Sequence, residues 1–273
     1  MTIKTKFAIS VASTSLLLAV GFGCTQLKAR DRVNKGVHAF KAAKYAEAVD
    51  HFQAATEIDP TFDTARLYLA TAFYQQYIPG AESPENLEMA NKAKAEYSKV
   101  LEKDKNNGLA LASIASLYFH QKKWDEAEQW NKRLVEADPK SKEGFYTLGV
   151  IAWTRSFSKR LEARAKLSMK PEDPGPIKDA KVRQALRAEL LPVLNTGLEH
   201  LNKAVEIDQE YDDAMVYINL LHRERADMQN DVAEFKKDFA AAENWVEKAM
   251  NIKKIKQERA AKAQPGGIVQ DFR

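Results

Sequence analysis

Apolar side chains near the start of the chain recur at helical spacing in two short stretches. Val33, Val37 and Phe40 form the first stripe. The second stripe consists of Tyr45, Ala48, Val49, Phe52 and Ala55. Both follow the i, i+3, i+4, i+7 spacing of an amphipathic helix. Residues 41–44 are only long enough for a tight reversal, and Pro60 ends the second helix. The pattern predicts a helical hairpin whose apolar faces need neighbouring hairpins to cover them.

Similar periodicity continues along most of the chain and predicts an all-α protein of about five hairpins. The predicted repeats are residues 29–62, 63–107, 108–141, 142–211 and 212–256. The second and fourth are longer than the others. In the fourth, residues 154–196 contain no helix breaker except a Pro-rich turn near 171–176 and Pro192, so we expect an elongated hairpin that projects beyond the array.

The first hairpin resembles a tetratricopeptide repeat, whose pattern is W-x2-L-G-x2-Y, then A-x3-F, then P. Gly36, Ala48, Phe52 and Pro60 occupy the Gly, Ala, Phe and Pro positions, whereas the first half departs from the pattern. Arg32, Lys35 and Ala39 stand where the Trp, Leu and Tyr would be. Repeat-packing positions farther along the chain are Ala115, Ala127, Pro139, Gly149 and Ala204. The resemblance implies an α-solenoid over residues 29–256.

In this family the first helix of each hairpin lines a concave groove that holds a peptide or a partner helix. The resemblance places these residues in the groove: Asn34, Val37, Lys41, Tyr68, Tyr74, Ser116, Phe119, Tyr146, Trp153 and Tyr217. An aromatic groove suits a segment with apolar anchors, because Tyr and Trp combine a large contact area with a hydrogen-bonding edge. The alternative is that several of these rings belong to the core between repeats.

Some members of the family clamp a C-terminal carboxylate with Lys, Arg and Asn side chains. The corresponding positions here hold Val33, Val37, Tyr68, Leu109 and Ser113. That specific function is therefore not expected.

The N-terminus has the pattern of a secretory signal. Lys4 and Lys6 precede an apolar stretch at residues 7–22. This stretch is short for a membrane-spanning helix, which needs about 20 residues. It ends at Gly23 and Cys24, the only cysteine of the chain. The arrangement resembles a bacterial lipoprotein cleavage site, although Gly21 stands where such sites usually carry Leu.

The lipoprotein resemblance implies that residues 1–23 are removed and that Cys24 carries the lipid, with residues 24–28 as a tether. Thr25, rather than Asp, follows the cysteine, which favours the outer membrane. We therefore expect an exported protein that is lipid-anchored and faces the periplasm. An ordinary signal peptide and an uncleaved anchor are the alternatives.

Positive charge gathers in the predicted elongated hairpin. Residues 154–196 hold ten Lys and Arg against five Asp and Glu, while the whole chain carries a net charge of +4. We take Arg160, Arg164, Arg183 and Arg187 as the basic arm. One interpretation is a surface that binds anionic lipid headgroups or an acidic partner. The alternative is a solvated hairpin without a specific role. The polar tail, residues 257–273, is expected to be disordered.

The remaining patterns argue against catalysis. The five histidines, at 38, 51, 120, 200 and 222, lack metal-ligand spacing, and there is no Gly-rich phosphate loop or nucleophile elbow. We therefore expect no enzyme activity, metal, cofactor or small-molecule substrate. The net charge is too small to indicate nucleic-acid binding.

What remains is binding of a protein or peptide partner in the cell envelope. Similar architectures occur in the tetratricopeptide subunit of the outer-membrane β-barrel assembly machine and in the pilotins of type IV pili. We therefore expect a tethered scaffold in outer-membrane protein assembly or pilus biogenesis. The alternative function is a membrane-surface or polyanion binder that acts through residues 154–196.

Overall fold

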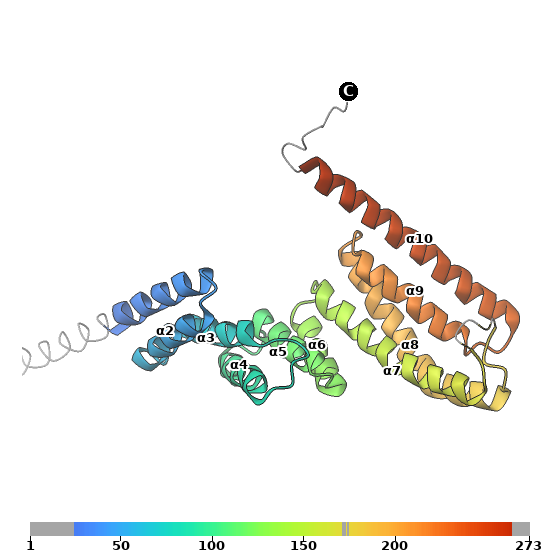
Figure 1. The fold of residues 1–273 in the computed structure, drawn as a ribbon, viewed down its shortest axis with the longest axis horizontal. Helices are drawn as coiled ribbons and strands as arrows, with labels where there is room; N and C mark the ends of the chain where they lie inside the picture. The colour runs from blue at the N-terminus through green and yellow to red at the C-terminus, as the bar shows by residue number, and fades with distance from the viewer. Residues whose placement is uncertain (1–24, 171–172, 174, 264–273) are drawn as a thin grey trace, which may run out of the picture. The chain divides into compact units, whose positions relative to one another are not determined.

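A computed structural model describes residues 25–170, 173 and 175–263. The predicted signal peptide and Cys24 lie outside these residues. Every regular element in the described part is an α-helix, which confirms the all-α prediction. Helical residues 25–41 precede α2 (Tyr45–Ile58), α3 (Asp63–Gln76), α4 (Pro84–Lys103), α5 (Gly108–His120), α6 (Trp124–Ala137), α7 (Lys142–Lys166), α8 (Ala180–Ile207), α9 (Asp212–Ala226) and α10 (Val232–Ala263) (Figure 1).

Each predicted repeat corresponds to two helices, although the first helix begins before residue 29 and α10 continues past residue 256. Helices that follow one another also pack together. Contacts join α2 to α3, α3 to α4 and α4 to α5, and likewise α7 to α8, α8 to α9 and α9 to α10. The chain divides into two compact units, Met1–Trp130 and Asn131–Arg273, and the division falls inside α6. Each unit is therefore described by itself.

Small residues let the helices of the first unit approach closely. A Cβ added at Gly36 would lie 2.5 Å from the Phe52 ring, so only glycine fits there unless the ring moves. Phe52 is buried, as are Ala48, Ala115 and Ala127. Pro60 is exposed and follows the end of α2, which is where a residue without a backbone N–H is tolerated.

The second unit has its core where α7, α8 and α9 meet. A Cβ added at Gly149 of α7 would collide with the side chain of Leu201 of α8. Gly197 of α8 lies against Ala152 of α7 and Leu221 of α9 in the same way. Leu201 and the nearby Ala204 are fully buried, whereas Pro139 is exposed after α6. Glycines thus permit the close contact of three helices.

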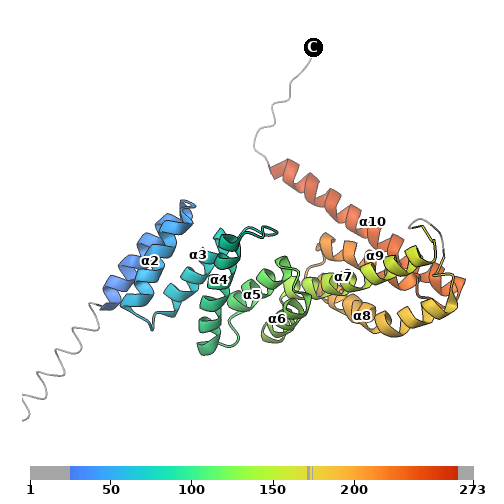
Figure 2. The same ribbon diagram turned by 60° about the horizontal axis from the view of Figure 1, so that its bottom comes forward.

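The fourth hairpin is elongated, because α7 has 25 residues and α8 has 28, with Pro192 inside α8. It does not project alone, however. α9 runs beside α8 (Figure 1 and Figure 2), and the residues after α9 reach the connection between α7 and α8. There, the backbone N–H of Ile177 donates to the carbonyl of Asp227 at 2.9 Å. The prediction that this hairpin projects beyond the array is therefore wrong, because the fifth hairpin packs along one side of it.

The prediction of a disordered tail is also wrong for residues 257–263, because α10 continues through Ala263. This segment is rich in Ala, Glu, Lys and Arg, which are good helix formers. Lys256 pairs with Asp212 at 2.5 Å and Arg259 with Glu210 at 2.7 Å, which ties this end to the turn before α9. Residues 264–273 lie outside the described part.

Candidate functional site: an aromatic ladder on α7 and α9

Five aromatic rings form a continuous row in the second unit. α7 contributes Tyr146, Trp153 and Phe157, whose i, i+7, i+11 spacing places them on one helix face. Tyr211 at the N-cap of α9 and Tyr217 within α9 complete the row. The order is Tyr211, Tyr146, Tyr217, Trp153 and Phe157, with successive ring centroids 5.2, 5.5, 5.5 and 5.0 Å apart. We call these five residues the aromatic ladder.

The aromatic ladder is neither core nor free surface. All five side chains are half-buried, and four of them, all except Phe157, pack against the buried core that includes Leu194, Leu201 and Ile218. Such edge-to-face and tilted ring pairs at 4.5–7 Å stabilise one another beyond their burial. The ladder is therefore held in place from below while part of each ring remains accessible.

The environment keeps the ladder's tyrosines protonated. Burial, followed by nearby Tyr217 and Asp213, raises the pKa of Tyr146 well above its ordinary value. Burial, followed by Glu143 and Asp213, raises the pKa of Tyr211 to about 12. Burial and the charge of Asp213 also raise the pKa of Tyr217. All three hydroxyls therefore remain neutral hydrogen-bonding groups at physiological pH.

A cation already lies against each end of the aromatic ladder. The Lys142 ammonium is 5.2 Å from the centroid of the Tyr211 ring, and the Arg160 guanidinium is 5.6 Å from that of Phe157. Lys142 also pairs with Asp208 at 2.7 Å, and the hydrogen bond between them raises the pKa of Lys142. The rings are therefore able to receive positive charge, as expected from their electron-rich faces.

The remaining predicted groove residues lie in the first unit, where a hydrogen bond joins two of them. The Tyr74 hydroxyl and the Ser116 hydroxyl share a hydrogen bond of 2.9 Å between α3 and α5. Tyr68 packs on Phe52, and Phe119 packs on Trp124, with ring centroids 5.4 Å apart in each pair. Phe52 and Trp124 are not predicted groove residues.

Within the described residues, the three N-terminal groove candidates make no ring contact or hydrogen bond with the other predicted groove residues. Asn34 and Lys41 are exposed on the first helix, and Val37 is half-buried. By contrast, Tyr146, Trp153 and Tyr217 form one contiguous surface.

Sequence reasoning missed Tyr211 and Phe157 as members of this surface. Phe157 follows Trp153 by four residues on the same helix, so the helical spacing could have revealed it. Tyr211 lies at the predicted boundary between two repeats, where a position in the pattern does not indicate which way a side chain points.

The basic arm is largely a structural network rather than a free basic surface. Arg164 is only 2% exposed, and it donates to the Asp227 carboxylate at 2.9 Å and to the carbonyls of Lys170 and Asp173. Arg160 pairs with Glu224 at 2.5 Å and with Asp227 at 2.9 Å. A buried, paired guanidinium cannot also contact a lipid headgroup, so this part of the basic-arm interpretation is wrong.

The other two arginines of the basic arm also bond to neighbouring chain segments. Arg183 donates to the carbonyl of Ile177 at 2.5 Å. Arg187 donates to the carbonyl of Met228 at 3.2 Å and to the side chain of Gln229 at 2.7 Å. Most of the groups that accept hydrogen bonds from Arg160, Arg164 and Arg187 lie at the end of α9 or just after it. A charge count over residues 154–196 does not include these groups.

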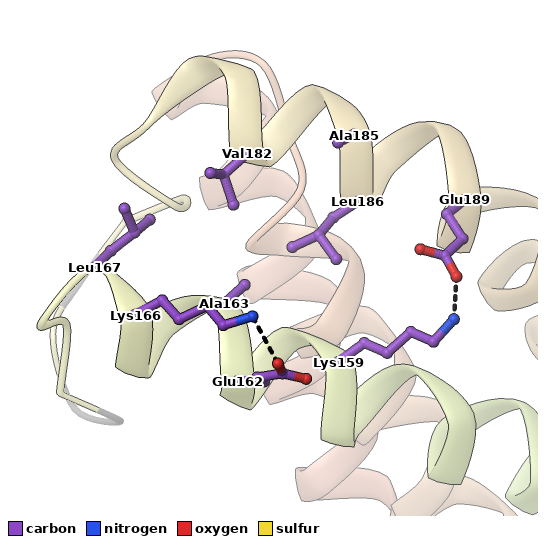
Figure 3. Close-up of a pocket in the computed structure, with 9 residues that line it drawn as sticks. All are labelled: Lys159, Glu162, Ala163, Lys166, Leu167, Val182, Ala185, Leu186 and Glu189. Atoms are coloured by element: carbon purple, nitrogen blue, oxygen red, sulfur yellow. Dashed lines mark hydrogen bonds and ion pairs between the residues drawn. The ribbon is translucent and has the colours of Figure 1, made fainter.

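The elongated hairpin also has a surface pocket of about 440 Å³ between α7 and α8 (Figure 3). Its lining is largely apolar and includes Leu167, Val182 and Leu186. Two ion pairs lie at its edge: Lys159 with Glu189, and Lys166 with Glu162 at 2.7 Å. These lysines of the hairpin are therefore neutralised locally, which further weakens the interpretation as a polyanion surface.

Two further observations concern the described part of the chain as a whole. Within it, no three His, Cys, Asp or Glu side chains are grouped so that they could hold a metal ion. None of the helices described is both long enough and apolar enough to cross a membrane.

Comparison with known proteins identifies the class. Family models described as Tetratricopeptide repeat match residues 33–78 and 87–148. Among solved structures, the MamA RS-1 ArsTM double mutant is 16% identical with a TM-score of 0.56, covering 85% of this chain and 97% of its own. MamA 41-end from Desulfovibrio magneticus RS-1 is 16% identical with a TM-score of 0.54, covering 83% and 96%.

A third similar structure is that of YrrB, described as a TPR protein with an unusual peptide-binding site. It is 14% identical with a TM-score of 0.51, covering 81% of this chain and 84% of its own. No curated protein matches the chain. Residues 33–78 and 87–148 therefore contain tetratricopeptide repeats, which confirms the repeat resemblance there. The chain folds as an α-solenoid, which confirms the predicted fold class.

Proposed function

We propose that this protein is an exported, membrane-tethered scaffold that binds a protein or peptide partner over the aromatic ladder. The observation that carries the proposal is the unbroken contact of five half-buried rings from α7 and α9. The similarity to YrrB, which is described as having a peptide-binding site, supports a role of this class.

The physical reason is that the aromatic ladder is organised before any partner arrives. Aromatic side chains lose little conformational entropy on binding, because each has only two rotatable side-chain bonds. Neighbouring rings and the core beneath already hold Tyr146, Trp153 and Tyr217 in place. Tyr and Trp are also the residue types that most often dominate binding energy at protein interfaces.

We place the scaffold in the cell envelope, in outer-membrane protein assembly or pilus biogenesis, with a lipid on Cys24 as its anchor. The support comes from the N-terminal sequence, where a basic segment and an apolar stretch lead to the single cysteine. A lipid-anchored scaffold would hold its partner near the membrane. No nucleic acid or small-molecule substrate is part of this proposal.

Crosslinking of the full-length protein in membranes tests the binding surface. A Tyr146→Ala/Trp153→Ala variant should lose a specific crosslinked partner that the unaltered protein retains. The matched control is Phe235→Ala/Phe239→Ala, which removes a stacked ring pair from α10, outside the aromatic ladder. Thermal unfolding of both variants verifies that they remain folded. Retention of every partner by a folded ladder variant would contradict the proposal.

A further inference from the structure

Carboxylates surround the tyrosine end of the aromatic ladder, and two of them are not committed to close ion pairs within the described part of the chain. Asp208 is held by Lys142 at 2.7 Å and Asp212 by Lys256 at 2.5 Å. The Glu143 side chain, in contrast, is 69% exposed and reaches Lys142 only at 4.0 Å. Asp213 is exposed and forms no ion pair within the described part of the chain.

Asp213 lies in the first turn of α9 and precedes Tyr217 by four residues, so the two side chains lie on the same face of the helix. Its charge opposes ionisation of Tyr146, Tyr211 and Tyr217, as their raised pKa values indicate. An exposed carboxylate on the helix face that carries Tyr217 makes the electrostatic potential at this end of the ladder negative, and the electron-rich ring faces add to the effect. A partner's carboxylate would be repelled here, and a cation would be attracted.

The protein's own side chains illustrate the chemistry of such a site. Lys142 sits over the Tyr211 ring while it pairs with Asp208, so one ammonium group uses a ring and a carboxylate together. Arg160 does the same at the other end, over Phe157 and paired with Glu224 and Asp227. Between these ends, Asp213 supplies an exposed carboxylate on the same face of α9 as Tyr217, whose ring lies 5.5 Å from that of Tyr146.

We infer that the partner segment carries a Lys or Arg side chain next to its apolar anchor. This inference rests on the proposed function and specifies the partner's chemistry. The apolar anchor packs on Tyr217, Trp153 and Phe157. The basic side chain lies over the Tyr146 and Tyr217 rings and pairs with Asp213, with Glu143 adding long-range attraction.

A selection of randomised displayed dodecapeptides on the full-length protein tests the inference, because every peptide sequence competes equally for the surface. Recovered peptides are synthesised, and their affinities are measured for four proteins: the unaltered protein, Tyr146→Ala/Trp153→Ala, Asp213→Lys and Glu199→Lys. Glu199 is an exposed carboxylate of α8 and provides the matched charge reversal outside the aromatic ladder. Asp213→Asn separates loss of charge from reversal.

Enrichment of Lys or Arg beside an aromatic or aliphatic residue is the expected result. Asp213→Lys should weaken those peptides roughly tenfold, the combined effect of a lost ion pair and a less favourable ring site. Glu199→Lys should leave them unchanged, and Asp213→Asn should fall between. Replacing the peptide's Arg by citrulline should remove the dependence on Asp213.

The two possible failures are distinguishable. Peptides that need Tyr146 and Trp153 but lack basic enrichment, or ignore Asp213→Lys, would overturn the inference and leave the proposed function standing. The absence of any peptide that depends on Tyr146 and Trp153 would overturn the proposed function and the inference with it. Circular dichroism melts of each variant exclude unfolding as the cause.

Discussion

Gly149 of α7 has no side chain at the point where Leu201 of α8 lies against it, and this absence sets the distance between the two helices. Gly36 does the same for Phe52 in the first unit. In both cases the ring or branched side chain opposite is buried and occupies the space that a Cβ would need. At the scale of single residues, helix packing in this protein therefore depends on glycine at specific positions.

The change Gly149→Ala should lower the free energy of unfolding by about 1–3 kcal/mol, because the added methyl forces Leu201 or a helix to move. Denaturant unfolding measures this. The matched control is Gly108→Ala at the start of α5, where an added Cβ meets nothing within 4 Å. That variant should be neutral or more stable by up to about 1 kcal/mol. Equal effects of the two substitutions would contradict the packing argument.

Tyr211 should contribute to alkaline unfolding. Its pKa is raised to about 12 by burial and by the Glu143 and Asp213 charges, whereas an unfolded tyrosine has its ordinary value of 10.0. The folded state therefore retains the proton longer, and the stability linked to Tyr211 is fully present below pH 10 and is lost as the pH rises through 12.

The change Tyr211→Phe should make stability less sensitive to pH in this window. Denaturant unfolding at pH 9, 10 and 11 checks the prediction, with Tyr68→Phe as the control at an exposed tyrosine. If Tyr211→Phe leaves the pH dependence of the free energy of unfolding unaltered, Tyr211 does not contribute to alkaline unfolding.

Among the helices, the elongated hairpin depends on a buried ionic network rather than on its own two arms. Arg160 and Arg164 of α7 reach across to Glu224 and Asp227 at the end of α9. Burial raises the pKa of Glu224, and Arg160 counteracts this effect. Such a network is stabilising only when every charge has its partner, because an unpaired buried charge is costly.

Arg164→Ala should therefore destabilise the protein by about 3–5 kcal/mol, because it leaves Asp227 buried with one partner fewer and removes a donor from the carbonyls of Lys170 and Asp173. Lys159→Ala is the control on the same helix. Its side chain is 50% exposed and its pair with Glu189 is at the surface, so a loss of at most about 1 kcal/mol is expected. If denaturant unfolding shows that the two variants lose similar amounts of unfolding free energy, the buried network has no special role in stability.

At the scale of the whole molecule, the repeats form two compact units, each with helices that pack on their neighbours in sequence. The aromatic ladder belongs entirely to the second unit. The proposed anchor, Cys24, precedes the first helix described. Anchoring and partner binding are therefore assigned to different parts of the chain and can be altered separately.

Cys24→Ala should move the protein from the membrane fraction to the soluble fraction of the envelope and leave peptide binding unchanged, because a lipid on the cysteine is the proposed anchor. Fractionation with metabolic labelling by a fatty-acid analogue measures both anchor and lipid. Thr25→Asp is the control, which should retain the lipid and shift the protein to the inner membrane. Membrane association of Cys24→Ala without lipid would contradict the lipoprotein proposal.

The helical character and the elongated fourth hairpin followed from the sequence, because they depend on local properties. Apolar spacing predicts a helix, breakers end it, and small residues such as Gly36 and Gly149 mark close approaches. Tyr146, Trp153 and Tyr217 could also be grouped from the sequence, because each lies on the first helix of a repeat, and the structure places their rings in contact.

The roles of the charged residues, by contrast, were decided only by the tertiary structure. Arg164 and Asp227 are 63 residues apart in sequence, so no local pattern shows that one neutralises the other. The same holds for Tyr211, which joins the aromatic ladder only when α9 packs on α7. Helix formation depends on neighbours in sequence, whereas the pairing of charges and the assembly of the aromatic ladder depend on which helices lie side by side.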